Sequence, residues 1–364
     1  MADIRPCRTE DLEHVVRLFL RSFRKGQGHS VTAATAYFQR LYFANPWYDE
    51  AMPSLVADGP GGIVAFIGVV PLPVRVDGVP LRVAIGGNLM VDPSVQDPMV
   101  AARLLRRYFA GAQDLAFTDT ANEHALRLWS SLGGRVGRFS SMRWVLPLRA
   151  GALGLAGVRR ASSNRALAAL ARTVVWPADR LSRSRLLPVA TGITVHEVAP
   201  GVVHDFAAVV GDRGYAHPHV DAVGFDWLID MCRQKQQFGP LRVLRFDHPD
   251  GRDVGVAAYY PNAGGLGQVL LLQAREGAHA EVLDALALDA AAHGAAALVG
   301  QADARLMVAL GQRASTYVQR NEFVTVLPGR SPEAVAAATR LSAGDVSLSR
   351  LVGEWWTRMQ GDVF

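Results

Sequence analysis

The same order of strand and helix patterns occurs twice in this chain of 364 residues, once on each side of an arginine-rich segment. Residues 4–148 show the order strand, helix, helix, three strands, helix, strand, helix, strand. After residue 191 the order returns, without obvious residue identity between the halves. Such a repeat predicts a tandem α/β (α+β) protein in which each copy has a mixed central sheet flanked by helices.

The patterns also predict where the domains begin and end. Asp77-Gly78 predicts a hairpin turn between two strands, and Gly133-Gly134 predicts the end of a helix over 122–132. The strand at 141–148 then falls in the first domain and the strand at 323–327 in the second. The expected divisions are a first α/β domain at 1–150, a basic helical connector at 151–190, a second α/β domain at 191–330, and a C-terminal helix and tail at 331–364.

Positive charge is concentrated in the connector. From Arg149 to Leu186 there are eight arginines and one acidic residue, Asp179, so this stretch carries +7 and the remaining chain sums to 5 − 7 = −2. The segment fits a solvated linker, and it also fits contact with an acidic substrate or a membrane surface. The preference for arginine over lysine fits a GC-rich genome better than phosphate recognition, so nucleic acid is not an expected partner.

The composition and the first ten residues limit which classes of protein this chain can belong to. Half of the residues are hydrophobic, which suits two ordinary cores. Residues 1–10 are charged where a signal peptide needs an apolar run, and no stretch has eighteen uninterrupted apolar residues. We therefore expect a cytoplasmic protein without a transmembrane segment. Cys7 and Cys232 fit neither a disulfide framework nor a metal-ligand spacing, so we expect both to be buried and no metal to be bound.

Two windows carry recognisable motifs. The first is Asn88-Leu-Met-Val-Asp-Pro-Ser-Val-Gln-Asp-Pro-Met-Val-Ala-Ala-Arg-Leu-Leu105, a strand that ends in Val-x-Pro and leads through a loop into a helix. The second is Asn122-Glu-His-Ala-Leu-Arg-Leu-Trp-Ser-Ser-Leu-Gly133. Together they resemble the two central motifs of the GNAT superfamily of acyl-CoA N-acyltransferases, Q/R-x-x-G-x-G/A before one helix and N-x-x-A-x-x-x-Y-x-x-x-G on the next. With the element order, the resemblance covers residues 2–149.

The resemblance implies a cofactor site. The first motif falls on Gln96, Met99 and Ala101, and the second on Asn122 and Trp129. Amides at a helix N-terminus, at the positive end of the helix dipole, can cradle the pyrophosphate of coenzyme A when small side chains let the backbone approach. The residues implied to bind acetyl-CoA or another acyl-CoA are Met90, Val91, Gln96, Met99, Val100, Ala101, Ala102, Asn122 and Trp129.

Several residues depart from the family pattern. Met99 is bulky, Pro98 has no N–H, and Asp97 adds a carboxylate beside the expected phosphates. The family's tyrosine, which protonates the leaving thiolate, is replaced by Trp129, whose indole has no usable acidic proton. The candidate catalytic residues are Asn88, on the strand expected to splay, and His124, in the first turn of the next helix.

The second half lacks an equivalent loop. After the strand at 268–272 the chain reads Gln273-Ala-Arg-Glu-Gly-Ala-His, with Glu276 where a phosphate would lie, so we expect a degenerate copy of the fold. The sequence therefore predicts an N-acyltransferase that moves an acetyl or other acyl group to a primary amine on a small molecule. The tail Gly353-Glu354-Trp355-Trp356 is similar to the ends of two-domain GNAT-like proteins from bacterial polysaccharide loci, which suggests an amino sugar.

Two other classes of function remain open at this point. One is a catalytically inactive acyl-CoA-binding or scaffold protein, which the departures at Pro98, Met99 and Trp129 favour. The other is a FemABX-like aminoacyl transferase, which also has tandem GNAT-like domains and would use charged tRNA. A homo-oligomer is left open as well.

Overall fold

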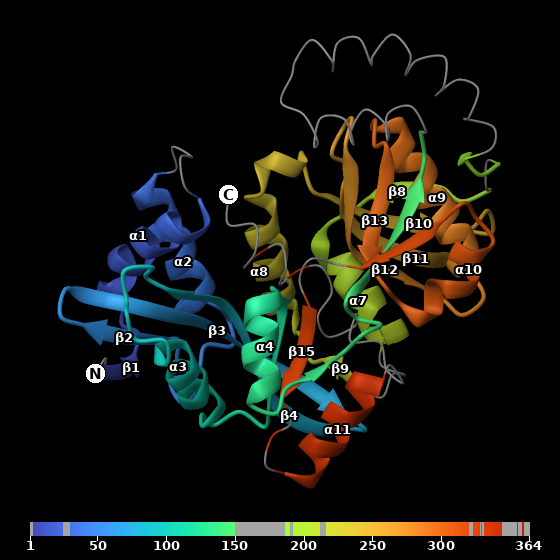
Figure 1. The fold of residues 1–364 in the computed structure, drawn as a ribbon. Helices are drawn as coiled ribbons and strands as arrows, with labels where there is room; N and C mark the ends of the chain where they lie inside the picture. Colours follow the sequence, from blue (N-terminus) through green and yellow to red (C-terminus); the bar gives the residue numbers. More distant parts are fainter. Residues whose placement is uncertain are drawn as a thin grey trace. The chain divides into compact units, whose positions relative to one another are not determined.

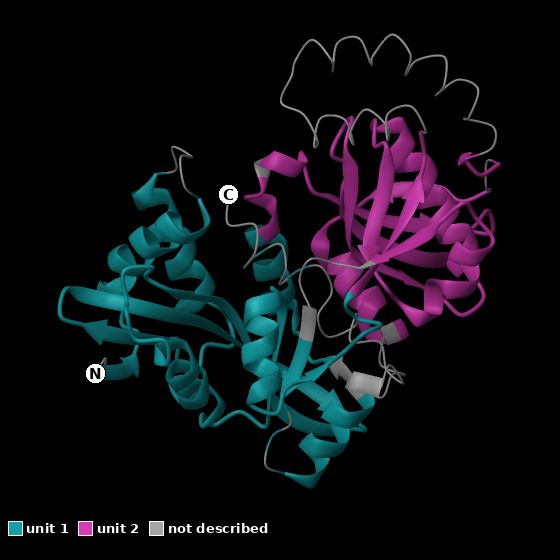
Figure 2. Ribbon diagram, in the orientation of Figure 1, with its two compact units in different colours: residues 1–141, 214–231, 320–364 teal, residues 142–213, 232–319 magenta. Residues whose placement is uncertain are grey.

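The computed structural model describes residues 3–24, 30–149, 186–189, 192–211, 216–319, 323–327, 329, 331–343, 355 and 359. The chain divides into two compact units, shown in Figure 2. The first comprises residues 1–141, 214–231 and 320–364, and the second comprises residues 142–213 and 232–319. Each unit is built on one mixed sheet, as the repeat predicted. The expected connector lies outside the described residues apart from 186–189.

The sheet of the first unit has the strand order β1-β2-β3-β4-β5-β15-β6, and β9 pairs with β3. Its strands are β1 (Asp3–Pro6), β2 (Leu55–Gly59), β3 (Gly62–Val76), β4 (Val79–Val91), β5 (Leu115–Ala121), β6 (Arg135–Val136), β9 (Ala216–Pro218) and β15 (Phe323–Leu327). Its helices are η1 (Thr9–Asp11), α1 (Leu12–Phe23), α2 (Val31–Tyr42), α3 (Val100–Phe109), α4 (Glu123–Ser131) and α11 (Pro332–Ala343). The residues of α8 (Ala222–Arg233) divide between the two units.

Helices α1 and α2 cover one face of this sheet, and α3 and α4 cover the other (Figure 1). Side chains alternate along β3, so Phe66 points to the first face and Ile67 to the second. The ring of Phe66 packs against Tyr42 of α2, with centroids 5.5 Å apart. Ile67 belongs to the core that includes Leu104 and Leu105 of α3. The two faces therefore form separate apolar layers around β3 and β4.

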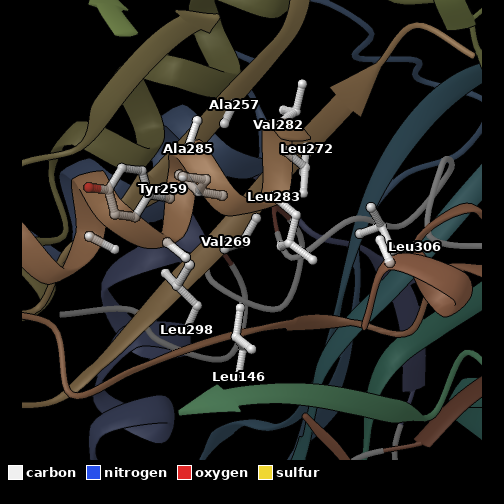
Figure 3. Packing of buried hydrophobic residues seen from close by; sticks show 14 of the residues in the cluster. Leu146, Ala257, Tyr259, Val269, Leu272, Val282, Leu283, Ala285, Leu298 and Leu306 are labelled. Atoms are coloured by element: carbon white, nitrogen blue, oxygen red, sulfur yellow. The ribbon is translucent and has the colours of Figure 1, made fainter. Parts of the chain in front are cut away.

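The sheet of the second unit has the strand order β14-β7-β13-β12-β11-β10-β8. Its strands are β7 (Met142–Pro147), β8 (Thr194–Glu197), β10 (Arg242–Asp247), β11 (Asp253–Tyr260), β12 (Leu266–Ala274), β13 (Ala297–Gln301) and β14 (Thr316–Gln319). Its helices are α7 (Pro200–Gly211), η2 (Gln236–Phe238), α9 (His279–Ala292), η3 (Ala304–Leu306) and α10 (Met307–Gly311). Figure 3 shows Val282, Leu283 and Ala285 of α9 among side chains from β7, β11, β12 and β13.

The last strand of each half pairs in the sheet of the other unit. β7 follows the first half in sequence but lies between β13 and β14, where Val145 pairs on both sides. β15 comes from the second half but lies between β5 and β6, where Val326 pairs on both sides. The expectation that strand 141–148 belongs to the first domain, and strand 323–327 to the second, is therefore wrong. An alternating pattern shows that a strand has a buried face, but it does not show which sheet the strand joins.

Candidate functional site

The first unit has an opening in its sheet between β4 and β5. These two strands are parallel and paired at three positions, from Val83 with Leu115 to Ile85 with Phe117. Beyond Ile85, β4 continues to Val91 paired only with β3, while β5 continues to Ala121 paired with β15. We call this divergence, bordered by residues 86–91 of β4 and 118–121 of β5, the first opening. Backbone groups on its inner edges are free of the β4–β5 ladder and can meet an extended ligand.

A β-bulge lies in β4 where the opening begins. Asn88 and Leu89 together face the single residue Ile67 of β3, and Asn88 has the left-handed φ of 51°. The bulge changes which side chains point to each face: Leu89 packs on the α3 side, whereas Met90 is buried away from that core. The sequence indicated a strand here, and the bulge itself left no recognised signal.

Asn88, predicted to be catalytic, contacts the α2 side of the sheet. Its Nδ2 atom donates a hydrogen bond of 2.8 Å to the hydroxyl of Tyr42. Burial raises the pKa of Tyr42, and the bond from Asn88 opposes that shift. Asn88 is 9% exposed, and its amide is used inside the protein. The arrangement fixes the shape of the bulge, which is a positioning role.

The loop after β4 leads into the N-terminus of α3. Asp97 accepts a hydrogen bond from the amide of Met99 at 2.9 Å and forms a 2.7 Å ion pair with Arg103. Arg103, and then the Met99 amide, hold the pKa of the Asp97 carboxyl below its usual range. The carboxylate that the sequence placed beside the phosphates therefore has its own cationic partner. That pair offsets part of the repulsion that Asp97 would exert on an anion.

The first turn of α3 presents backbone amides. The amide of Val100 makes a long bond of 3.4 Å to the carbonyl of Asp97, and the first bond with the i→i−4 spacing of an α-helix runs from the amide of Arg103 to the carbonyl of Met99, at 2.9 Å. Ala101 and Ala102 come before it, so their amides belong to the unpaired first turn of the helix. Gln96 and Met99 are exposed at this end, and Val100 is buried beneath it. Val91, Gln96 and residues 99–102 thus follow one another from the end of β4 to the start of α3, whereas Met90 is buried away from the α3 core.

The second motif occupies α4. Asn122 caps the helix, because its Oδ1 atom accepts a hydrogen bond of 2.9 Å from the amide of Ala125. His124 is exposed in the first turn. Trp129 is 2% exposed, and its ring packs on Phe109 of α3 with centroids 4.9 Å apart. Phe109 lies eight residues after Ala101, about 12 Å along the helix at 1.5 Å per residue. Trp129 is therefore a core side chain at the opposite end of α3 from the amides.

Two polar residues on β5 were not predicted. Thr118 and Asp119 directly follow the last residue paired with β4, and they are 3% and 0% exposed. Ala116 faces the α3 core, so alternation places Thr118 on that face, and the register shift against β15 then falls at Asp119 and Thr120. Thr118 and Asp119 both lie inside β5, which continues to Ala121. A carboxylate among apolar strand residues was the available signal in the sequence.

A hollow of about 270 Å³ lies elsewhere in the first unit. Its lining includes Met52, Leu55 and Val69 together with Tyr108 and Gln113, so it sits at the C-terminal end of α3. The amides of the first turn are at the other end of the same helix. This hollow is therefore separate from the first opening.

The second unit has a similar opening between two parallel strands, but the residues before its helix differ. β12 and β13 are parallel and paired only from Leu266 to Gln268, and β12 then continues to Ala274 beside β11. Arg275, which follows the strand, binds Asp253 through Nε and Nη2 at 2.7 and 2.6 Å. Exposed Glu276 stands before α9. The helix start of this unit is thus poorly suited to an anion.

Other predicted features can be checked in the part of the chain that the structure describes. Cys7 and Cys232 are both buried, as expected. Within the described ranges, no group of histidine, cysteine and acidic side chains has an arrangement that could hold a metal ion. No helix among those residues is long and apolar enough to cross a membrane.

Several solved structures are similar to this chain in fold. A conserved protein from Enterococcus faecalis V583, described as a probable N-acyltransferase, is 9% identical with a TM-score of 0.56, over 90% of this chain and 72% of that one. A GCN5-related N-acetyltransferase from Kribbella flavida is 12% identical with a TM-score of 0.54, over 93% and 73%. The N-myristoyltransferase of Saccharomyces cerevisiae, solved with bound myristoyl-CoA, is 11% identical with a TM-score of 0.52, over 91% and 79%.

These likenesses show the fold. The chain has two GNAT-like domains, each with a mixed sheet flanked by helices, which confirms the expected fold class. No protein-family model matches the sequence, and no curated protein matches it significantly.

Proposed function

We propose that this chain is an N-acyltransferase that uses acetyl-CoA or another acyl-CoA. The observation that carries the proposal is the coincidence, in the first unit, of a strand opening, a bulge at its edge and unpaired helix amides at its end. The structural neighbours that are described as N-acyltransferases and N-acetyltransferases support it. The reaction is attack of a primary amine on the thioester carbonyl, after which the C–S bond breaks and the thiolate takes a proton.

The cofactor would lie along β4 and end at α3. On the side of β4 that faces β5, the backbone near Met90 and Val91 has no strand partner. An extended pantetheine arm can pair with it there, as an added strand does at a sheet edge. The pyrophosphate would then reach the amides of Ala101 and Ala102, where the helix dipole favours negative charge. Gln96 and Met99 border this end, and the small side chains at 101 and 102 allow close approach. Asn122 would hold the start of α4 beside the opening.

Asp119 is the group in the first opening best suited to accept the amine proton. It is a fully buried carboxylate on the strand that borders the opening. A base must also lie within reach of the attacking nitrogen, and Asp119 follows the last paired residue of β5 by only two positions. His124 is exposed in the first turn of α4 and is the second candidate. Positioning by the opening supplies the rest of the rate enhancement.

Burial of Trp129 favours one alternative, a catalytically inactive acyl-CoA-binding protein. The family's phenol is absent, and the ring that replaces it packs in the core. Thiol release from acetyl-CoA with a panel of primary amines, amino sugars included, separates the two functions. An acyltransferase releases free thiol with at least one amine, whereas a binding protein retains the cofactor and releases none.

A pair of matched substitutions tests where the cofactor binds. Ala101→Glu places a carboxylate in the first turn of α3, and Ala280→Glu places one at the corresponding second residue of α9. We expect calorimetry to show that Ala101→Glu abolishes acetyl-CoA binding and that Ala280→Glu preserves it, both with native circular dichroism. Unchanged affinity in a folded Ala101→Glu protein would contradict the assigned loop.

A further inference from the structure

The opening of the second unit carries a different set of groups from that of the first. The β12–β13 ladder ends where Gln268 pairs with Val299, and the strands diverge beyond it. A register shift near Tyr259 of β11 accommodates one extra residue in β12. We call the gap bordered by residues 269–274 of β12 and 300–301 of β13 the second opening. The hydrogen-bonding groups around this opening indicate which kind of ligand it can bind.

Trp144 reaches this opening from the exchanged strand β7. It pairs across the sheet with Gly300, the first residue of β13 beyond the ladder. A Cβ atom at residue 300 would lie 2.5 Å from Cζ2 of Trp144 and 3.0 Å from its Nε1, so the indole lies directly over this glycine. Only glycine leaves that space. The Nε1 atom of the indole therefore lies over β13 at residue 300, which borders the second opening.

The indole N–H is a buried donor without an acceptor. Trp144 is 1% exposed, and its Nε1 atom has no hydrogen-bond partner among the described residues. The neighbouring Tyr317, which pairs with Trp144 across β7 and β14, likewise has a hydroxyl without a partner there. Buried polar groups in folded proteins are nearly always hydrogen-bonded, so the indole N–H of Trp144 points to an acceptor that binds it. Tyr317 lies on β14, on the other side of β7 from the second opening.

Two glutamines border the opening on the opposite face of the sheet. Val269 and Leu272 belong to the α9 core, so alternation and the bulge place Gln268 and Gln273 on the other face. Gln268 is 6% exposed, and its Nε2 atom donates to the carbonyl of Leu266 at 2.8 Å. The Oε1 atoms of both glutamines lack partners among the described residues. The opening thus has the Trp144 indole N–H as a donor on one face and two amide acceptors on the other.

The charged groups nearby are already engaged or unfavourable to an anion. The guanidinium of Arg275 binds Asp253 and lies 5.2 Å from the ring centroid of Phe206. Glu276 adds negative charge before α9. A phosphate-bearing cofactor is therefore disfavoured in the second opening. The uncharged donors and acceptors instead match a neutral chain that carries both N–H and C=O groups.

We propose that the second opening binds an extended, uncharged amide chain through Trp144 Nε1, Gln268 and Gln273. A secondary amide is both donor and acceptor, so it can satisfy an indole N–H and a glutamine carbonyl at once. A peptide backbone and the pantetheine arm of an acyl donor share this chemistry. The inference does not depend on catalysis in the first unit, because every group that carries it lies in the second.

The experiment uses the full chain and two uncharged probes, pantetheine and an N-acetylated, C-amidated trialanine. The indole N–H signal of Trp144 is assigned in ¹⁵N spectra by its loss in Trp144→Phe, and that of Trp227, another buried indole without a described acceptor, serves as the control. We expect at least one probe to move the Trp144 signal downfield and to leave the Trp227 signal in place. The probe that acts identifies the source of the amide chain.

Affinity gives the second readout. Gln268→Leu should weaken binding of that probe about tenfold or more, the factor expected for one lost hydrogen bond, and Trp227→Phe should leave it unchanged. Thermal unfolding confirms that the variants fold. If neither probe moves the Trp144 signal at millimolar concentration, or if folded Gln268→Leu binds as tightly as the parent, the proposal is overturned. Loss of acetyl-CoA binding in Ala101→Glu would leave these results unaffected, so the two proposals fail separately.

Discussion

Cutting the chain within the connector should leave neither half able to fold alone. A break near residue 170 gives fragments 1–170 and 171–364, which preserve every described residue. The first fragment carries β7 without β13 and β14, and it lacks β15 between β5 and β6. The second fragment carries β15 without β5 and β6, and it lacks β7 between β13 and β14. Each sheet therefore loses an inner strand, together with hydrogen bonds on both sides of it.

The size of the effect follows from the side chains on β7 and just after it. Trp144, Leu146 and Leu148 are 1%, 2% and 0% exposed in the core of the second unit. Burying one large apolar side chain contributes about 1.5–3 kcal/mol, so the three contribute about 5–9 kcal/mol together. A domain of ordinary stability has only about 5–15 kcal/mol in total. The second fragment should accordingly be unfolded or aggregated at 25 °C.

The assay compares each fragment alone with the two produced together. Circular dichroism and thermal unfolding should show no cooperative transition for either fragment, and co-expression should give a stable one-to-one complex with a single transition. A fragment 1–170 that is monomeric and unfolds cooperatively on its own would refute the exchange of β7 and β15.

Three further outcomes follow from single sites. Asp119→Asn should lower kcat with an amine acceptor about 10²- to 10⁴-fold and leave acetyl-CoA affinity by calorimetry unchanged, and an unaltered kcat would exclude it as the base. Trp129→Ala should cost about 3–5 kcal/mol in urea unfolding because the ring fills the core under α3, and a loss below 1 kcal/mol would place it elsewhere. Arg5 lowers the pKa of Asp11, so stability present at neutral pH should fall as the pH drops below about 4. Asp11→Asn should flatten that acid limb, measured by thermal unfolding from pH 3 to 7.

Much of the first domain could be predicted from local sequence signals. Asn122 followed by helical periodicity predicted the start of α4, and the Asn122 cap bond confirms it. Asp77-Gly78 predicted the β3–β4 hairpin, where both residues have positive φ. These features depend on a few neighbouring residues, so sequence is enough. Helix α3 begins at Val100, just after the Met99 amide donates to the Asp97 carboxylate.

The features that the sequence did not reveal depend on distant partners. Asp119 belongs to β5 because the strand continues past Thr118, where pairing with β15 keeps it extended. The bulge at Asn88 depends on Tyr42, which lies 46 residues away and bonds its amide. The position of the Trp144 indole depends on Gly300, because a side chain at residue 300 would occupy the space of the ring. Tertiary contacts override local preference in each case.

The most direct test of the central claim is a crystal structure of the full chain with acetyl-CoA. The account predicts electron density for the pantetheine arm between β4 and β5, with the pyrophosphate oxygens within hydrogen-bond distance of the Ala101 and Ala102 amides and the thioester near Asp119. Density for the nucleotide and pyrophosphate at the start of α9, with the first opening empty, would contradict it.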